Sequence, residues 1–222
     1  MMVLNFGAIL LAYRLFGKIG LFIWIPISVI VANIQVIKFV TIFGMDNTLG
    51  NIVYATAFLV TDILSENYGK KEARKAVYIG FFAITVMTVL MYVALLFKPN
   101  PFDESQSALS FIFTKMPLIA FASLSAYCIS QMHDVWAYHF WKNRNPAKRY
   151  IWIRNNASTI VSQFIDSTIF VGIAFFFTEP FRLVFQIWIT TFVLKVIVAA
   201  VDTPFIYLAT YMKDKNIVKE TE

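Results

Sequence analysis

Residues 154–177 read RNNASTIVSQFIDSTIFVGIAFFF, and this stretch decides the fold class. It is long and apolar enough to cross a bilayer, because a hydrocarbon core of about 30 Å takes about 20 helical residues. Five of its residues step by three or four and so form one stripe on a helix. They are Asn156, Thr159, Gln163, Asp166 and Phe170, and all but the last are polar. Because the other faces are apolar, the stripe should face protein or an aqueous cavity, and we predict one wall of a binding site.

The composition of the whole chain indicates an integral membrane protein. The 222 residues are 59% hydrophobic and only 14% charged, which lies outside the range of soluble domains. The net charge of +6 comes from short basic segments between apolar runs, a pattern that argues against a nucleic-acid surface. Cys128 is the single cysteine, so an intramolecular disulfide and a multi-cysteine metal site are both excluded.

Membrane-length apolar segments divide the chain into six spans within one transporter domain, residues 1–222. The predicted spans are residues 21–40, 51–68, 77–97, 118–141, 156–177 and 183–212. Residues 1–15 form a shorter hydrophobic helix, which either spans the membrane as a seventh helix or lies on its interface. We therefore expect an all-α membrane protein, a compact bundle of six transmembrane helices plus a short N-terminal helix.

The basic residues in the connections predict the orientation. If the helices alternate in direction, fourteen lysines and arginines fall on one side and three on the other. The positive-inside rule makes the first side cytoplasmic, including the tail 213–222 and the loop after residue 141. Residues 98–117 are then external, and we expect residues 109–113 to lie along the membrane surface.

Two acidic residues in the second span are candidates for a site. Asp62 and Glu66 are four residues apart and share a helix face. Glu66 lies close to Lys70 and Lys71. A position at a helix end near water therefore explains its charge as well as a role in a site does. Asp62 lies deeper, and a charge inside the core costs roughly 2.5 to 3.5 kcal/mol on insertion scales. Such a residue is rarely kept without a partner or a role.

A second stripe, in the fourth span, combines hydrogen-bonding groups with aromatic rings. Its members are Tyr127, Gln131, Asp134, Tyr138 and Trp141. A planar heterocycle needs both rings to stack on and a carboxylate or amide to read its edge. An aromatic belt at the interface accounts for Tyr138 and Trp141, but it does not account for Gln131 and Asp134.

Two further polar residues lie near mid-depth, and one short pattern occurs twice. Asn33 lies in the first span and Lys195 in the last. A buried lysine needs a carboxylate partner, because without one it tends to lose its proton. A purely structural ion pair of Lys195 is the alternative. The pattern Ser-Gln-x-x-Asp occurs at residues 130–134 and 162–166, on helices that should run antiparallel. It fits an inverted repeat of the transporter kind, although five residues can also match by chance.

Familiar catalytic motifs do not occur in the sequence, which has no Gly-x-Ser-x-Gly, phosphate loop or His-Glu-x-x-His. His133 and His139 are six apart and do not share a helix face, so we expect no metal site and no cofactor. Polar groups gathered in the core of a small bundle favour carriage of a polar solute. An enzyme that uses Asp134 and His133 as an acid/base pair on a lipid or headgroup is the competing hypothesis.

Several long motifs resemble the queuosine precursor transporter family. They are ANIQVxK at residues 32–38, TDILSE at 61–66, YGKKEAR at 68–74, SQxxDV at 130–135, RNNxSTxxSQxxD at 154–166, and LKV with DTP between 194 and 204. The similarity runs in order from residue 12 to about residue 211. The leading helix is short compared with relatives that begin earlier.

The resemblance implies an inner-membrane importer, not an enzyme, that takes up 7-cyano- and 7-aminomethyl-7-deazaguanine, or queuine, for salvage into tRNA queuosine. A substrate-capture subunit that needs a separate energy-coupling module is a lesser alternative. The expected partners are the small-molecule base and the lipid bilayer, without direct contact to nucleic acid, and a homodimer stays open. The predicted substrate-binding residues are Asn33, Asp62, Glu66, Gln131, Asp134, Asn156, Thr159, Gln163, Asp166 and Lys195. Asp166 either reads the donor edge of the base or neutralises Lys195.

The first testable prediction concerns topology. Cysteines placed at Asn145 and Ser107 and probed with a membrane-impermeant reagent should label only at Ser107 in intact cells, because the basic asymmetry puts residues 143–150 in the cytoplasm. Labelling at Asn145 alone would invert the topology.

Overall fold

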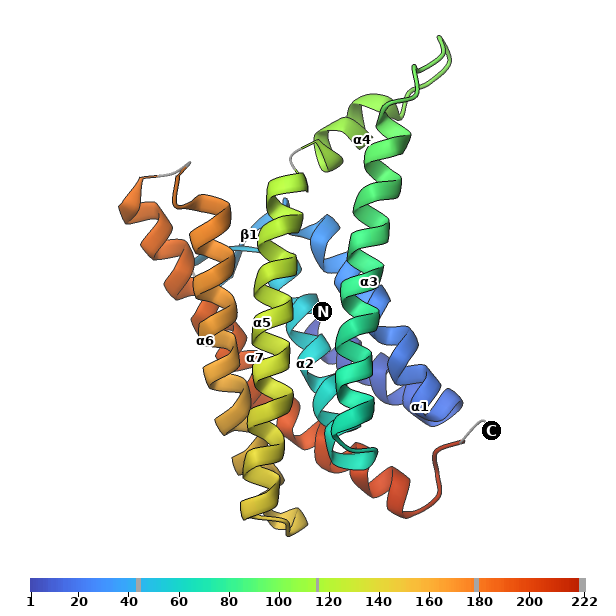
Figure 1. Ribbon diagram of the computed structural model, residues 1–222, viewed down its shortest axis with the longest axis vertical. Helices are drawn as coiled ribbons and strands as arrows, with labels where there is room; N and C mark the ends of the chain where they lie inside the picture. The colour runs from blue at the N-terminus through green and yellow to red at the C-terminus, as the bar shows by residue number, and fades with distance from the viewer. Residues whose placement is uncertain (43–44, 115, 178–179, 220–222) are drawn as a thin grey trace.

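The computed structural model describes residues 1–42, 45–114, 116–177 and 180–219. Within these ranges the chain is a helical bundle with one short β-hairpin, so the all-α expectation is confirmed (Figure 1). The elements are α1 (Met2–Gln35), β1 (Phe39–Ile42), β2 (Met45–Thr48), α2 (Gly50–Asn67), α3 (Lys70–Leu95), α4 (Gln106–Phe113), α5 (Met116–Arg144), the 3-10 helix η1 (Lys148–Tyr150), α6 (Ile151–Phe175) and α7 (Phe181–Asp214).

The number of membrane spans differs from the sequence prediction. Four helices of the described chain are long and apolar enough to cross a membrane, namely α1, α3, α6 with η1, and α7; α4 and α5 together add a fifth. The predicted span 51–68 corresponds to α2, which is not among them. This helix carries Asp62 and Glu66 and is covered by protein along most of its length. Six spans plus a leading helix are therefore not confirmed, although the chain is a multi-pass membrane protein.

Helix α1 joins the predicted leading helix and the first span into one element with a kink. Gly17 has a positive φ of 56°, a conformation that glycine adopts without a steric penalty. Beyond the kink the chain approaches its own first leg so closely that a Cβ on Gly20 would lie 2.2 Å from the Ala12 carbonyl oxygen. The first leg buries Phe6 and Tyr13 in the core, and Phe6 packs on Phe205 of α7. Residues 1–15 are thus part of the bundle.

The β-hairpin was missed by the sequence analysis, which extended the first span to residue 40. Helix α1 ends at Gln35, and β1 pairs with β2 antiparallel, Phe39 opposite Thr48. The hairpin returns the chain to the start of α2, where Gly50 lies against the end of α1. A Cβ at Gly50 would be 2.3 Å from the carbonyl oxygen of Ala32, so the close approach requires glycine.

Helix α2 is the centre of the bundle. It packs against α1, α7, α3 and α5, while α5 lies beside α6 and α6 beside α7 (Figure 1). Small and apolar residues such as Ala57, Val60 and Leu64 fill the contacts and are fully buried. Because α2 is surrounded by protein, its polar side chains can be satisfied only by other helices.

The outward faces of the bundle are apolar, as a lipid environment requires. Helix α3 exposes Phe82, Leu90 and Val93 while its charged residues are confined to positions 70–75. Helix α4 forms where the sequence predicted a surface segment, between α3 and α5. The Asp103 carboxylate precedes it and accepts hydrogen bonds from the Ser105 hydroxyl and from the backbone N–H groups of Ser105 and Gln106. These bonds stabilise the charged form and lower the pKa of Asp103.

Candidate functional site

A cavity of about 30 Å³ lies between α1, α2, α5, α6 and α7, in the half of the bundle that carries the β-hairpin. Its wall is formed by Ala32, Asn33, Val36, Gly50, Asn51, Tyr54, Ser123, Ala126, Asp166, Phe170 and Lys195. Five helices thus contribute to a single polar pocket with an aromatic component.

An ion pair between Asp166 of α6 and Lys195 of α7 forms the polar floor of this cavity. Both side chains are almost completely buried. The other carboxylate oxygen of Asp166 accepts hydrogen bonds from the Tyr54 hydroxyl at 2.7 Å and the Ser130 hydroxyl at 2.9 Å. The ammonium of Lys195 also lies 4.9 Å from the centre of the Tyr54 ring, within range of a cation–π interaction. Asp166 therefore neutralises the lysine and fixes its position.

Asn33 supplies a second polar group to the cavity. Its side-chain amide donates to the backbone carbonyl of Val29 at 2.8 Å, which fixes the orientation of the side chain. Its carbonyl oxygen is buried and has no hydrogen-bond partner within the described chain. On the neighbouring wall, Asn51 donates to Thr191 at 3.4 Å. The cavity thus presents an acceptor from Asn33 and ammonium donors from Lys195.

A second polar layer lies deeper in the bundle. The Thr61 hydroxyl of α2 donates to the side-chain carbonyl of Gln131 at 3.1 Å, and the amide nitrogen of Gln131 has no partner among the described residues. Gln163 is buried with both amide atoms unpaired in the same part of the chain. Neither glutamine lines the cavity.

Three carboxyl groups follow in the interior, each fully buried. Asp62 of α2 accepts from Thr159 at 3.4 Å, and Asp202 of α7 accepts from Asn155 at 2.9 Å. Asp134 of α5 faces Asp62 and the hydroxyls of α6, yet no hydrogen bond of regular geometry reaches either of its oxygens. None of the three carboxyl groups forms an ion pair within the described ranges.

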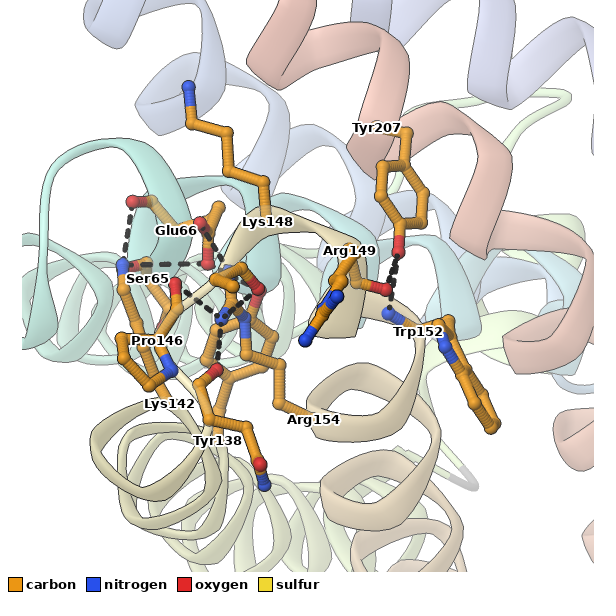
Figure 2. Close-up of polar contacts among 12 residues, drawn as sticks. Ser65, Glu66, Tyr138, Lys142, Pro146, Lys148, Arg149, Trp152, Arg154 and Tyr207 are labelled. Atoms are coloured by element: carbon orange, nitrogen blue, oxygen red, sulfur yellow. Dashed lines mark hydrogen bonds and ion pairs between the residues drawn. The ribbon is translucent and has the colours of Figure 1, made fainter.

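Glu66 is the centre of a polar cluster at the end of the bundle opposite the β-hairpin, shown in Figure 2. Its carboxylate pairs with Arg154 at 2.5 Å, accepts from the Tyr138 hydroxyl at 3.0 Å and lies 3.4 Å from the Lys142 ammonium. Lys142 also donates to the carbonyls of Ser65 and Glu66, where α2 ends. A cation at a helix C-terminus is favourable there.

Arg154 ties this cluster to the connection between α5 and α6. Its side chain is fully buried and donates to the Asn145 carbonyl at 2.9 Å. On the other side of the connection, the Tyr207 hydroxyl of α7 donates to the Arg149 carbonyl at 3.0 Å. Helices α2, α5, α6 and α7 are therefore linked at this end.

The repeated Ser-Gln-x-x-Asp pattern produces reciprocal contacts between α5 and α6, which lie side by side and run in opposite directions (Figure 1). Ser130 of α5 donates to Asp166 of α6, and Ser162 of α6 faces Asp134 of α5. The first residue of each copy thus meets the last residue of the other. This exchange is what a local two-fold axis between antiparallel helices produces, so the repeat has a structural counterpart.

The predicted site residues lie at three levels of depth along the bundle, which are the cavity, the interior and the end opposite the β-hairpin. Asn33, Asp166 and Lys195 line the cavity, and Asp62, Asp134, Gln131, Gln163 and Thr159 lie in the interior without lining it. Glu66 belongs to the far cluster, and Asn156 binds the Trp152 carbonyl and the Thr203 hydroxyl near that end. The ten residues do not surround one central site. Whether any of them binds substrate stays a prediction.

Sequence reasoning did not select three of the side chains that shape these levels. Tyr54 lies two steps of four residues before Asp62, so helical spacing could have placed it on the face of α2 that carries polar groups. Ser130 stands in the repeated pattern but was not chosen as a site residue. Arg154 opens the stretch 154–177 and was counted among the basic residues that set the orientation, but it was not chosen as a site residue, because a sequence does not reveal that a side chain at a helix start is buried.

The described residues include no group of three or more histidines, cysteines, aspartates or glutamates arranged to hold a metal ion. The cavity is small, its polar groups are those of a lysine, a carboxylate and amides, and it has aromatic faces from Tyr54 and Phe170. This chemistry suits a neutral, flat and polar molecule.

Comparison with known proteins identifies a family. Residues 48–209 match the family model described as "Putative vitamin uptake transporter". The chain is 42% identical over 210 residues to the "Probable queuosine precursor transporter" of Bacillus subtilis (strain 168), covering 95% of this chain and 92% of that protein. It is 26% identical over 140 residues to the protein of the same name from Haemophilus influenzae, covering 63% and 57% of the two chains. No solved structure matches.

The buried Glu66–Arg154 pair generates a stability prediction. Glu66→Gln leaves the Arg154 guanidinium without its carboxylate, and we expect the free energy of unfolding to fall by about 3 to 5 kcal/mol. Thermal melting of the purified protein measures the change. Adding Arg154→Met should restore most of the stability, because the fully buried guanidinium is then gone and only the partly exposed Lys142 lacks its ion-pair partner.

The matched control is Glu72→Gln, which breaks the partly exposed pair with Lys18 at 3.3 Å. Its effect should stay under about 1 kcal/mol, since exposed ion pairs contribute little. Equal losses in Glu66→Gln and Glu72→Gln would contradict a special role for the buried pair.

Proposed function

We propose, from the premise that this chain belongs to the queuosine precursor transporter family, that it imports 7-deazaguanine bases across the inner membrane for salvage into tRNA queuosine. The substrates are 7-cyano- and 7-aminomethyl-7-deazaguanine, or queuine. The observation that carries the proposal is the cavity with the Asp166–Lys195 ion pair at its floor. The chain is not an enzyme, since its named relatives are transporters.

The cavity is nearly closed in this structure. Its volume of about 30 Å³ is far below the roughly 300 to 1,000 Å³ of ligand pockets, so entry of a base requires the surrounding helices to move apart. The described residues that line the cavity include no arginine, so the lining favours a free base over a nucleotide with its phosphate.

The polar groups of the cavity complement the edge of a 7-deazaguanine. The base carries a carbonyl next to a ring N–H and an exocyclic amine. Lys195 can donate to the carbonyl, while the unpaired oxygen of Asn33 can accept from the adjacent donors. The rings of Tyr54 and Phe170 offer faces for stacking. Adenine would present an amine to the lysine in place of the carbonyl, and two donors facing each other would leave buried groups unpaired.

Asp166 acts in this proposal by positioning Lys195. A carboxylate has about four acceptor sites, and three donors already occupy those of Asp166. The remaining capacity is too small for the two adjacent donors of the base. Of the two roles that the sequence left open, the crowded hydrogen bonding of Asp166 supports the one in which it neutralises the lysine.

The arrangement of the levels supports import through alternating access. The cavity lies at the end with the β-hairpin, and the basic asymmetry of the sequence makes that end external and the C-terminus cytoplasmic. Between the cavity and the opposite end stand the glutamine layer, the buried carboxyl groups and the Glu66 cluster. Release to the cytoplasm then requires α2, α5 and α6 to separate at that end.

Queuosine formation provides the test of function. In a host that lacks its own precursor synthesis and its own transporter, expression of this chain should restore queuosine in tRNA when 7-cyano- or 7-aminomethyl-7-deazaguanine is added. Omitting the base, or expressing no transporter, should give no queuosine. Unchanged queuosine levels with well-expressed protein would contradict the proposal.

Substitutions in the Asp166–Lys195 ion pair distinguish a loss of base binding from a loss of stability. Lys195→Met should weaken base binding by roughly one to two orders of magnitude, because a hydrogen bond from a charged donor is worth about 1.5 to 3 kcal/mol. Asp166→Asn should lower thermal stability by leaving the lysine unpaired. Uptake of labelled base, normalised to folded protein, and thermal melting are measured for both variants and for the double mutant.

In the double mutant Asp166→Asn/Lys195→Met we expect stability to recover while uptake stays low, since both charges are gone but so is the donor. Recovery of uptake together with stability would show that the pair is structural and that Lys195 does not contact the base. Thr168→Ala is a control outside the cavity, because Thr168 lies at an exposed position of α6, where it accepts a hydrogen bond from Trp188.

A further inference from the structure

The two carboxyl groups of the α5–α6 repeat differ in their surroundings. Asp166 meets Ser130 from the other copy, Tyr54 from α2 and Lys195 from α7. Asp134 meets Ser162 from the other copy, but on its side α2 contributes Asp62 and α7 contributes Asp202. Asp166 therefore has a hydroxyl from α2 and a cation from α7 as neighbours, whereas Asp134 has a carboxyl group from each of these two helices.

The charge around Asp134 is therefore uncompensated. All three aspartates are 0% exposed, and no ion pair reaches any of them in the described part of the chain. Both oxygens of Asp134 and one oxygen of Asp62 lack a hydrogen-bond partner there. Two buried carboxylates side by side without a cation cannot both stay ionised.

The remaining titratable groups nearby do not supply a cation. On the helices around Asp134 these groups include Tyr54 and Glu66 of α2, His133, Tyr138, His139 and Lys142 of α5, Arg154 and Asp166 of α6, and Lys195 and Asp202 of α7. Lys142 is paired with Glu66, and Lys195 with Asp166. Arg154 is paired with Glu66, and His133 shares a hydrogen bond with Ser162 at 2.9 Å. In α3, charged residues occur only at positions 70–75, and α1 has none after Lys18.

We propose that Asp62 and Asp134 form a proton-binding site and that one proton accompanies each base into the cell. A hydrogen bond between the two carboxyl groups through this proton removes their repulsion and uses the oxygens that otherwise lack partners. This inference rests on the proposed function for its coupling to uptake. The binding of the proton itself rests only on the geometry of the pair.

A proton fits this site better than a metal ion does. A metal would need several ligands converging on one point, and the described residues offer no such group of acidic or histidine side chains. The polar neighbours of Asp134 other than Asp62 are the hydroxyls of Ser158, Thr159 and Ser162. These groups can donate to a carboxylate or accept from a carboxylic acid, so they accommodate both protonation states.

The position of the pair explains how a proton could be coupled to transport. Asp62 and Asp134 lie on α2 and α5, in the interior of the bundle between the cavity and the Glu66 cluster. Loss of the proton would place two like charges across the contact between these helices and favour their separation. Because α2 and α5 also carry the cavity residues Tyr54 and Ser123, that separation would disturb the cavity. Proton binding and base binding therefore favour each other, so both are taken up outside and released together inside. Each transport cycle then moves one base and one proton into the cell together.

The experiment uses the purified full chain in proteoliposomes with labelled 7-cyano-7-deazaguanine. With acid outside, accumulation in the wild type should rise by up to about tenfold for each pH unit of gradient, because one proton per base transfers that free energy to the base. Asp134→Asn should lose this gradient-driven accumulation but retain exchange of labelled for unlabelled base. An amide cannot release a proton, although it still permits the site to open and close.

Glu72→Gln is the matched control, since it removes a partly exposed carboxylate outside the interior, and it should respond to the gradient like the wild type. Wild-type accumulation that ignores the pH gradient, or follows a sodium gradient instead, would overturn the proposal. The same holds if Asp134→Asn keeps the full response. Absence of both uptake and exchange in the wild type would count against the proposed function, and proton binding is then decided separately.

That separate measurement is thermal melting of wild type and Asp134→Asn across pH. Deprotonation of the pair buries unpaired charge in the folded state only, so wild-type melting temperature should fall as pH rises. The decline should be smaller in Asp134→Asn. An identical pH response of the two proteins would overturn the proton site even where both fold well and whatever base they carry.

Discussion

The ion pair between Asp166 and Lys195 is the interaction on which the arrangement of the cavity depends. A lysine in the interior of a membrane protein must be compensated, and Asp166 provides its counter-charge while Tyr54 and Ser130 complete the carboxylate's hydrogen bonds. These contacts bring together α2, α5, α6 and α7. The same contacts leave the ammonium facing the cavity, so the group that stabilises the bundle is also the one available to a ligand.

Polar residues elsewhere in the bundle follow the same constraint. Helix α2 carries Asp62, Glu66 and Thr61, and it is tolerated in the membrane because four neighbouring helices cover it. Glu66 is satisfied by Arg154, Lys142 and Tyr138, whereas Asp62 and Asp134 have no such cation. The bundle therefore contains two compensated carboxylates and one uncompensated group between them. That contrast places the proposed proton site between the cavity and the Glu66 cluster.

The repeated pattern in α5 and α6 gives this path a common geometric origin. Antiparallel helices that carry the same five-residue pattern exchange contacts, Ser130 with Asp166 and Ser162 with Asp134. The helices that pack against them, α2 and α7, differ at corresponding places. One copy receives Tyr54 and Lys195, the other Asp62 and Asp202. A symmetric pair of helices thus acquires two different chemical environments from asymmetric neighbours.

The sequence by itself determined the membrane class, the helical nature of the long apolar segments and the family, because hydropathy and long motifs are properties of the chain alone. Spacing also placed Asp166 on a helix face that turns inward. Only the tertiary structure decided that Asp166 pairs with Lys195, that α2 is enclosed, that α1 folds at Gly17, and that Glu66 and Asp134 belong to separate levels. Helical periodicity fixes the direction of a side chain around its own axis. It does not fix the rotation, depth and tilt of one helix against another, and those decide which polar groups meet.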